Sequence, residues 1–410
     1  MLRSSVVIIE PSSSGLDLIA AVARAGYHPL VFSYDAADRV VPAAALRRWG
    51  AELVVLDTND PAAVLQGASQ AARSQQIVGV LPGFEFYVPV AAQLATHLGL
   101  PGLEPAAGQR VRDKHLMRRA LAAAGIAGPR FRLISDTSEL EAAAAQVGYP
   151  LVVKPTRSAG SIGVSLASCL DEVRAAYAAI AYEPTLDLGT RLGPDVLLEE
   201  FVPGPEYSVE GFVQHGRTAV VSITEKLVSD PPHFVELGHT VPASIEPATE
   251  RQVVTWTAEV VRALGIDCTV FHLELRLRDG IPHVIELGAR LPGDSIGSLI
   301  EMSRGVSLAD LFVQLATGQQ VDHPTVQASC VAAIRFFYEP GLDIVNSAPT
   351  DSELHTLPNV VTGAVTVSPG DRPNGRADFR SRLGWVLMTG ADRRSVDRSW
   401  KAVKETARFT

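Results

Sequence analysis

Two glutamates, Glu274 and Glu286, lie in alternating apolar runs on either side of an Asp279-Gly280 dipeptide. An Asp-Gly pair between such runs predicts a β-hairpin. With a three-residue loop over 279–281, the glutamates would stand opposite each other on one face. Opposed Cβ atoms are about 5 Å apart, where like charges repel. A cation between them would relieve this repulsion, and hard carboxylate oxygens without Cys or clustered His favour Mg²⁺, which binds carboxylates together with substrate phosphates.

The same hairpin has a second interpretation. Arg276 could neutralise Glu274 on a solvated face, and the spacing of the two acids would then be accidental. Position parity also places Arg290 on the Glu286 side, just past the strand end, where a guanidinium can hold a phosphate or a carboxylate bidentately. Paired acids, a cation and an anion clamp together indicate phosphoryl chemistry.

The composition predicts a globular protein and excludes several classes of ligand. At 410 residues the chain is long enough for two or three domains. It has 36 basic and 45 acidic residues and a net charge of −9, so nucleic acid, which calls for a basic stripe, is not expected as a partner. The cysteines, Cys169, Cys268 and Cys330, form no CxxC pair, so neither a disulfide framework nor a zinc site is predicted.

The N-terminus predicts a strand rather than a targeting segment. Its apolar run, 6–9, is too short for the hydrophobic region of a signal peptide and is followed at once by Glu10. No run approaches the ~18 apolar residues needed to cross a membrane. We therefore expect a soluble cytoplasmic protein without a membrane partner.

Residues 1–105 have the pattern of a parallel α/β sheet with helical crossovers. The first loop has serines at 12–14 and Gly15 at a helix start but lacks a GxGxxG fingerprint. These serines are either N-cap residues or contacts of a small molecule at the sheet edge, and the N-cap interpretation is favoured. The predicted strands cover 6–9, 30–32, 53–56 and 77–81, and the predicted helices cover 16–25, 61–75 and 88–98.

Two lysines in the next region are suited to phosphate binding. Lys114 lies in a predicted helix over 110–124, and Lys154 ends a predicted strand over 151–155. A loop of small residues follows Lys154, and its bare backbone N–H groups can approach an anion closely. Lys-Ser/Thr does not follow the glycines, so this is not a Walker A loop, and alone it predicts only a hairpin with a flexible tip. The loop contains Gly160, Ser161 and Gly163.

A connecting segment then links two predicted strands, 196–202 and 206–213. The backbone of such a segment can hydrogen-bond a purine edge, and Glu206 beyond it can accept from ribose hydroxyls. The alternative is a structural turn with acids facing water. A strand with Lys226 and a helix over 249–264 follow, and the tail from about 325 predicts a small α+β subdomain.

Taken in order over roughly residues 110–295, these features resemble the ATP-grasp superfamily, and the N-terminal domain resembles its usual leading domain. The resemblance implies a mixed α/β and α+β fold class, with ATP between two α+β lobes of an ATP-grasp fold. The implied domains are an N-terminal α/β domain (1–105), a small lobe with a glycine-rich lid (106–190), a large lobe with the metal hairpin (191–325) and a C-terminal α+β subdomain (326–410).

The resemblance also assigns residues to ATP and metal. Glu274 and Glu286 would hold two Mg²⁺ ions, for which Mn²⁺ could substitute. Many members carry Asn two residues after the second glutamate as another ligand, and here that position is Gly288, so water or a phosphate oxygen would complete the shell. The residues implied to contact ATP phosphates, adenine or ribose are Lys114, Lys154, Gly160, Ser161, Gly163, Glu199, Glu200, Phe201, Val202 and Glu206.

Within the superfamily, the chain is most similar to carboxylate–amine ligases typified by bacterial L-amino acid ligases. Those enzymes have a Glu-x-x-His motif before the metal hairpin and an arginine four residues after the second metal glutamate, and this chain has Glu236, His239 and Arg290. The resemblance implies that Glu236 and His239 line an amino-acid pocket. Arg290 would hold the carboxylate or the acyl phosphate. Taken alone, Glu236 and His239 would be an ordinary loop acid and a partly buried core residue.

The implied function is ATP-dependent formation of a dipeptide-like amide through an acylphosphate, with release of ADP and phosphate. Arg290 is the expected oxyanion stabiliser, and either Glu236 or His239 the base. The implied partners are ATP, a small carboxylate and an amine, typically amino acids, and the family commonly forms homodimers. The alternatives are another ATP-grasp ligase of the purine-pathway or carboxylase type, and a non-catalytic ATP-binding regulatory protein.

Overall fold

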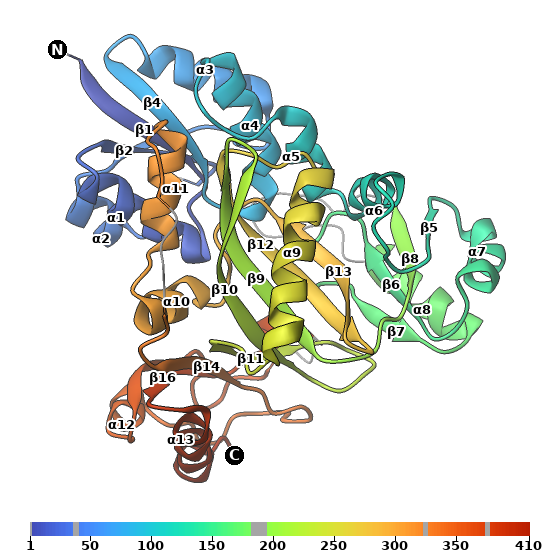
Figure 1. Ribbon diagram of the computed structural model, residues 1–410. Coiled ribbons are helices and arrows are strands. Elements are labelled where there is room, and N and C mark those ends of the chain that lie inside the picture. The colour runs from blue at the N-terminus through green and yellow to red at the C-terminus, as the bar shows by residue number, and fades with distance from the viewer. Residues whose placement is uncertain (1, 36–40, 182–194, 323–326, 374–377) are drawn as a thin grey trace.

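The computed structural model describes residues 2–35, 41–181, 195–322, 327–373 and 378–410. Figure 1 shows a blue N-terminal layer of strands and helices, a small green lobe at one side, and a long central sheet that continues into the red C-terminal region. The described strands form three sheets.

The N-terminal sheet is parallel, in the order β3-β2-β1-β4, as the alternation of strands and helices predicted. Its central strands are buried on both faces, which explains their unbroken runs of Val, Ile and Leu. Helix α2 is an addition to the predicted set. The strands are β1 (Arg3–Ile9), β2 (His28–Ser33), β3 (Glu52–Val55) and β4 (Gln75–Pro82), and the helices are α1 (Asp17–Arg24), α2 (Ala43–Trp49), α3 (Pro61–Ala71) and α4 (Val88–His97).

The carboxyl ends of β1 and β4 bring two loops together. The amide of Ser12 donates to the Gly83 carbonyl at 3.3 Å. A Cβ on Gly15 would lie 1.8 Å from that carbonyl oxygen, so the close approach of the two backbones requires glycine here. Ser12 stands at the N-cap of the short 3₁₀ helix η1 (Ser13–Leu16), but its side chain makes no capping hydrogen bond. Ser12 therefore has the predicted N-cap position but does not cap the helix through its hydroxyl group.

The small lobe is an antiparallel sheet in the order β5-β8-β6-β7, with two helices packed against it. Lys154 is the last residue but one of β6, near the strand end as predicted, and Glu199 lies on the neighbouring strand β8. The elements are β5 (Phe131–Ile134), β6 (Leu151–Pro155), β7 (Ser165–Ala167), β8 (Val196–Glu200), α7 (Leu140–Val147) and α8 (Leu170–Ala181).

The largest sheet is antiparallel, in the order β13-β12-β9-β10-β11-β14-β16-β15. Its strands are β9 (Glu206–Gln214), β10 (Arg217–Val228), β11 (Glu236–Val241), β12 (Thr269–Arg278), β13 (Ile281–Gly288), β14 (Val331–Phe337), β15 (Val360–Val365) and β16 (Gly384–Gly390). The remaining helices are α5 (Pro105–Arg112), α6 (Lys114–Ala123), α9 (Pro247–Ala263), α10 (Ile296–Arg304), α11 (Leu308–Ala316), α12 (Asp351–His355) and α13 (Arg393–Thr406).

The C-terminal region both extends this sheet and has its own core. Strand β14 pairs with β11, and β16 and β15 continue the sheet beyond it. A separate hydrophobic cluster that includes Phe337, Leu354 and Val403 packs β14 against α12 and α13. The boundaries of the four predicted domains stay predictions.

The single helix predicted over 110–124 is wrong, because the chain breaks at Asp113. This residue is extended (φ −113°, ψ 111°), and its carboxylate accepts the amide N–H groups of His115 and Leu116. Asp113 therefore caps a second helix, α6, and places Lys114 at its first residue. The amide of Lys114 donates to the Thr156 carbonyl at 3.0 Å, which ties the start of this helix to the end of β6.

The hairpin that carries Glu274 and Glu286 pairs these two residues as predicted, but for a different reason. Its loop is the two residues Asp279 and Gly280, both at positive φ, and not the predicted three. Continued without interruption, that register would place Glu274 opposite Ile285. A β-bulge at Ile285 adds one residue to β13 and brings Glu286 opposite Glu274. The bulge therefore decides that both carboxylates share one face.

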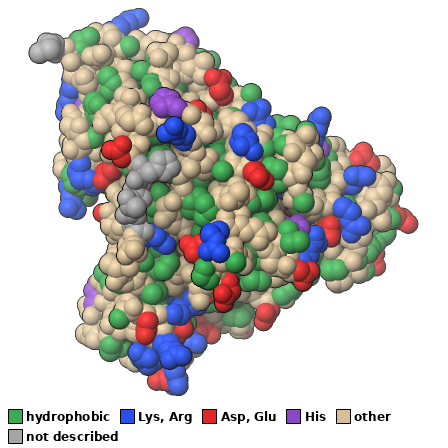
Figure 2. Space-filling model, in the orientation of Figure 1, with side chains coloured by type: hydrophobic (Ala, Val, Ile, Leu, Met, Phe, Trp, Pro, Cys, Tyr) green, Lys and Arg blue, Asp and Glu red, His purple; other side chains and the backbone are tan. Residues whose placement is uncertain are grey.

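Acidic and basic side chains are mixed over the face in Figure 2, with a group of basic side chains at its lower end, where α13 lies. Within the described ranges, none of the helices combines the length and the apolar character needed to cross a membrane.

Candidate active site

Two adjoining cavities lie between the small lobe, the large sheet and the N-terminal loops. The first, of about 120 Å³, is lined by most of the predicted site residues, and the second, of about 570 Å³, adds His239. Gly163 lines neither cavity and faces Pro155 and Ile180. The predicted residues at the first cavity are Lys114, Lys154, Gly160, Ser161, Glu199, Glu200, Phe201, Val202, Glu206, Glu236, Glu274, Glu286 and Arg290.

The two predicted phosphate lysines are buried and already paired. Lys114 donates to Glu286 at 2.8 Å and to the Ser158 carbonyl at 2.9 Å. Lys154 forms an ion pair with Glu199 at 2.5 Å. Burial, only partly opposed by Glu199 and reinforced by the charge of Arg118, lowers the pKa of Lys154 to about 8. This lysine is therefore close to losing its proton at neutral to alkaline pH.

The carboxylate of Glu199 forms ion pairs with two basic side chains, Arg118 and Lys154. Arg118 holds it through two hydrogen bonds of 2.6 and 3.0 Å and also donates to the Ile285 carbonyl in the bulge. Burial would raise the pKa of Glu199, but Arg118 and Lys154 outweigh it and lower that pKa. The side chain of Glu199 thus positions Lys154, and Arg118 links it to the hairpin of Glu274 and Glu286.

An aromatic pair borders the predicted adenine segment. The rings of Phe201 and Phe234 stack at 5.9 Å, and the guanidinium of Arg276 lies over both. Arg276 also donates to Glu206 at 2.9 Å and to the Val202 carbonyl at 3.1 Å. It does not neutralise Glu274, so that alternative for the hairpin is wrong. Sequence reasoning missed Phe234 and Arg276, because neither lies in the predicted connection.

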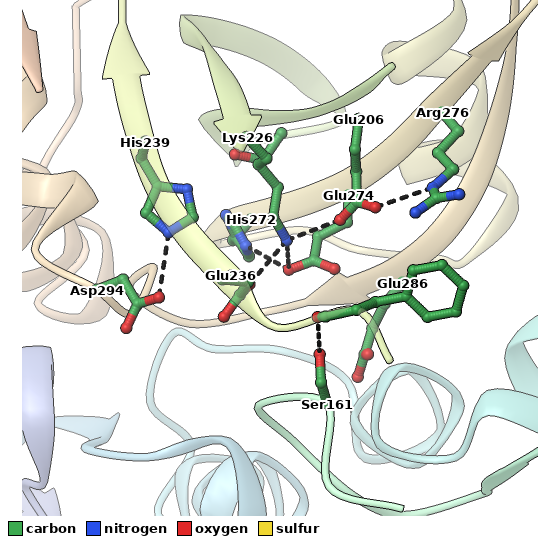
Figure 3. Close-up of polar contacts among 12 residues, drawn as sticks. Ser161, Glu206, Lys226, Glu236, His239, His272, Glu274, Arg276, Glu286 and Asp294 are labelled. Carbon is green, nitrogen blue, oxygen red and sulfur yellow. Dashed lines mark hydrogen bonds and ion pairs between the residues drawn. The ribbon is translucent and has the colours of Figure 1, made fainter. Parts of the chain in front are cut away.

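A buried lysine lies at the centre of three carboxylates (Figure 3). Lys226 contacts Glu274 at 2.7 Å, Glu236 at 2.9 Å and Glu206 at 3.1 Å. Burial would lower the pKa of Lys226, but the three acids raise it well above its ordinary value. The sequence showed Lys226 only as a strand residue, and its cross-strand pairing with Glu206 was the available signal.

A histidine supports Glu274 from the other side. His272 contacts Glu274 at 3.2 Å and the fully buried Glu210 at 2.9 Å. Burial opposes a charge on His272, but hydrogen bonds to the two acids raise its pKa to about 9. Glu210 in turn accepts hydrogen bonds from Ser208 and Thr224, both at 2.6 Å. This network, which sequence reasoning missed, fixes the orientation of Glu274.

Glu274 and Glu286 have the donor chemistry of a hard-cation site. They are paired across the hairpin, line the first cavity, and leave 20% and 22% of their side chains exposed. In the structure Glu274 forms an ion pair with Lys226, and Glu286 forms one with Lys114. Carboxylate oxygens that line the same cavity as lysine side chains suit Mg²⁺, which binds carboxylates together with phosphates, so the residues present fit this ion.

Arg290 is oriented by an acid from the N-terminal domain that sequence reasoning missed. Its Nε donates to Glu85 of the 3₁₀ helix η2 (Glu85–Tyr87) at 2.5 Å, and its Nη1 donates to the Leu291 carbonyl at 2.9 Å. Burial would raise the pKa of Glu85, but Arg290 and Arg112 outweigh it and lower that pKa. A Cβ at Gly288 would lie 3.1 Å from the Glu85 carboxylate, which therefore occupies the space of a side chain at 288.

Glu236 and His239 belong to a cluster completed from distant parts of the chain. His239 contacts Asp294 at 3.1 Å, and Arg382 donates to both oxygens of Asp294 at 2.8 and 3.0 Å. Arg382 also donates to the Glu236 carboxylate at 3.0 Å and lies over the Phe336 ring. Burial would raise the pKa of Asp294, but Arg382 and His239 lower it strongly.

This cluster bears on the choice between the two predicted bases. One carboxylate oxygen of Glu236 contacts Lys226 and the other contacts Arg382. His239 instead has an acid, Asp294, as its side-chain partner. The ligand atoms of Glu236, His239 and Asp294 lie within 4.8 Å of one another, as in a metal site, but Arg382 already supplies the cation.

The loop of small residues closes over the junction of the two cavities. Gly160 and Ser161 both have positive φ, at 62° and 61°. The Ser161 hydroxyl donates to the Phe234 carbonyl at 3.1 Å (Figure 3). This hydrogen bond ties the loop to the segment before β11.

Comparisons with known proteins agree with this geometry. Residues 147–298 match the ATP-grasp domain. The uncharacterised protein y4rH of Sinorhizobium fredii is 28% identical over 97% of this chain and 80% of its own length. The D-alanine–D-alanine ligase of Cupriavidus metallidurans is 29% identical over 56% of this chain and 72% of its own length.

A solved structure extends the likeness to the whole chain. The L-amino acid ligase from Bacillus licheniformis superimposes with a TM-score of 0.83 at 23% identity, over 100% of this chain and 99% of that one. At this identity the superposition establishes the fold. The predicted ATP-grasp fold is confirmed.

Proposed function

The chain carries an ATP-grasp domain and is an ATP-dependent ligase, and from this premise we propose that it joins a carboxylate to an amine through an acylphosphate. ADP and phosphate would be the other products. The observation that carries this proposal is the pair of adjoining cavities, with Arg290, Glu236 and Glu274 lining both. The lysines and glutamates that line the first cavity suit the phosphates of a nucleotide, and the second cavity, of about 570 Å³, has room for two small substrates.

In this proposal ATP occupies the first cavity. Lys114 and Lys154 contact its phosphates, the loop with Gly160 and Ser161 covers them, and the segment from Glu199 to Val202 borders adenine. The stacked Phe201 and its Arg276 neighbour support this placement, as does the burial of both lysines. Glu206 accepts from the ribose. Gly163 acts only as a bend in the loop, because it lines neither cavity.

ATP-grasp ligases use Mg²⁺, and Glu274 and Glu286 would hold it here. When bound, the ion would supply positive charge against the phosphates during phosphoryl transfer. Two ions, and the use of Mn²⁺ in their place, stay predictions.

Phosphoryl transfer requires mainly positioning and charge neutralisation. The substrate carboxylate attacks the γ-phosphorus and ADP leaves, with the acyl phosphate held by Arg290. The amine nitrogen then attacks the acyl carbon and phosphate leaves. Arg290 stabilises the tetrahedral oxyanion, and His239, oriented by Asp294, accepts the amine proton, because cations occupy both oxygens of Glu236.

The test is release of ADP and phosphate from Mg-ATP with each L-amino acid alone and in pairs. Mass spectrometry identifies the product, and Glu286→Ala is the blank. An amide that appears with phosphate and is absent with the variant supports the proposal. ADP release that depends on bicarbonate or a ribonucleotide would instead support a carboxylase-type or purine-pathway ligase. A cytoplasmic location and a homodimer stay predictions.

The lowered pKa of Lys154 predicts that the use of ATP depends on pH. The kcat/KM for ATP, which reports the free protein, should fall as the pH rises through about 8, because a neutral amine no longer attracts phosphate. Lys154→Arg should move this fall to higher pH, since arginine stays charged. Initial rates at limiting ATP would show both effects. A wild-type profile that stays flat well above this pH would contradict the assignment.

The lowered pKa of Lys154 makes the stability of the protein rise with pH, whereas kcat/KM for ATP should fall. The folded pKa of about 8 lies below the ordinary value of 10.5, so the unfolded chain binds more protons between these values. The contribution of Lys154 to the free energy of unfolding therefore rises with pH across that window. Denaturant unfolding of wild type and Lys154→Arg at both ends of the window would measure it.

Glu85→Gln should weaken the use of the carboxylate substrate more than that of ATP. Glutamine keeps the size and one acceptor oxygen but removes the charge that orients Arg290. We expect kcat/KM for the carboxylate to fall about 10–100-fold, the usual effect of losing a supporting partner. Steady-state kinetics with each substrate varied would measure this. The control is Glu52→Gln, whose side chain is 50% exposed, and equal losses for both substrates would contradict the role.

A further inference from the structure

The two cavities share only part of their lining, and we call the residues that line only the second cavity the recognition surface. In the proposed function the new bond forms where the cavities meet. Apart from His239, the proposed base, the residues that line only the second cavity therefore face the parts of a substrate that do not react. The shared residues are Ala159, Gly160, Glu236, His272, Glu274 and Arg290.

This recognition surface offers no free charge among the described residues. Its two acids are Glu85, paired with Arg290, and Asp294, paired with Arg382 and His239. The serines of the first loop add hydroxyl groups without charge. A charged substrate side chain would leave water without gaining a counter-charge, which is costly. The surface therefore suits a neutral side chain.

The same surface is largely aromatic and aliphatic. Phe84 and Phe86 meet edge to face, with ring centroids 4.9 Å apart, and both are only half-buried. Buried Ile162 and Leu291 line the cavity as well, and Phe379 keeps 38% of its surface exposed. Aromatic rings left partly uncovered inside a cavity are suited to an apolar ligand.

Phe379 links this surface to the loop over ATP. It begins the 3₁₀ helix η5 (Phe379–Ser381), more than two hundred residues after that loop. A Cβ at Gly160 would lie 2.6 Å from the Phe379 ring, so the ring packs directly on the loop. Arg382, just after η5, anchors the segment to Glu236 and Asp294. The C-terminal region thus holds one aromatic side chain against both the loop and the substrate cavity.

We propose that Phe379 is a specificity-determining residue that selects a neutral, apolar substrate side chain and seats it against the loop at Gly160. The role rests on the proposed function for the identity of the second cavity as the substrate site. It follows from the contact with Gly160, the exposed ring and the pairing of the nearby acids.

The first experiment measures binding and needs no turnover. The full-length protein with Mg²⁺ and a non-hydrolysable ATP analogue is titrated calorimetrically with L-phenylalanine, L-leucine, L-aspartate and L-lysine. We expect the two apolar amino acids to bind at least about tenfold more tightly than the charged ones, within the range that pocket contacts give. Equal or tighter binding of a charged amino acid, or no binding of any, would overturn the proposal.

The second experiment isolates Phe379. Phe379→Ala should weaken the binding of L-phenylalanine about tenfold, with a smaller effect on the binding of L-alanine and of the ATP analogue. Phe379→Leu should keep most of the affinity for L-phenylalanine. The control is Tyr34→Ala, an aromatic residue that is 50% exposed and lines neither cavity. Equal losses for both amino acids would overturn the proposal.

These outcomes are separate from those that test amide formation. If apolar amino acids bind through Phe379 but no amide forms, the proposed function fails and the specificity role stands. If amide forms equally well with charged and apolar side chains, the proposed function stands and the specificity role fails.

Discussion

Glu286→Gln should lower the kcat for ADP release about 10²–10³-fold, the loss typical of removing one electrostatic group from a transition state. The amide keeps the shape of the side chain and an oxygen that can accept from Lys114 at its present 2.8 Å. What disappears is the negative charge opposite Glu274, and with it one of the two carboxylates proposed to hold Mg²⁺. The protein should stay folded, because this side chain is 22% exposed at the cavity.

Two measurements separate a metal role from a structural one. Stopped-assay ADP release gives kcat, and calorimetric titration with Mn²⁺ in the presence of an ATP analogue gives the metal affinity, which should fall with the activity. Glu405→Gln is the control, since Glu405 is exposed on α13 and pairs only weakly with Lys401 at 4.0 Å. A kcat of Glu286→Gln within tenfold of the wild-type value would contradict the assignment of Glu286 as a metal ligand.

Lys226→Met should destabilise the protein by about 3–5 kcal/mol, the usual cost of leaving a buried charge without its partner. Methionine retains most of the stem volume, so the loss is mainly electrostatic. Three carboxylates, Glu206, Glu236 and Glu274, would face one another without the ammonium that now lies between them (Figure 3). The free energy of unfolding from denaturant titration measures this loss.

The cation dependence of this variant gives a second readout. Added Mg²⁺ should recover part of the lost stability, because a cation bound at Glu274 replaces some of the missing charge. Lys401→Met is the matched control: its side chain is 77% exposed, and it should change stability by less than about 1 kcal/mol. If both variants unfold at the same denaturant concentration, Lys226 does not hold the three acids together.

Much of the candidate site could be predicted because its residues carry their signal locally. An Asp-Gly turn between alternating runs indicates a hairpin, and the residue types of Glu274, Glu286 and Arg290 indicate cation and anion binding. The parallel N-terminal sheet followed from its buried apolar runs. These patterns depend on neighbours within a few positions, which the sequence displays directly.

The errors lie where one residue changes the local geometry. Asp113 breaks the predicted helix because its carboxylate caps the next one. Ile285 forms a bulge that offsets the shorter hairpin loop, so the pairing of Glu274 with Glu286 was right although the loop length was wrong. A cap and a bulge each change the backbone at a single residue, and propensity over a window does not resolve such a change.

The sequence alone determined which chemical groups are available and on which short elements they lie: the two lysines, the paired glutamates and the arginine beyond them. Only the tertiary structure decided their partners. Glu85 reaches Arg290 from the N-terminal domain, Arg382 reaches Asp294 from the C-terminal region, and Lys226 gathers acids from three other strands. Such contacts join residues far apart in the chain, and their geometry is set by how the sheets pack and by the need to pair every buried charge.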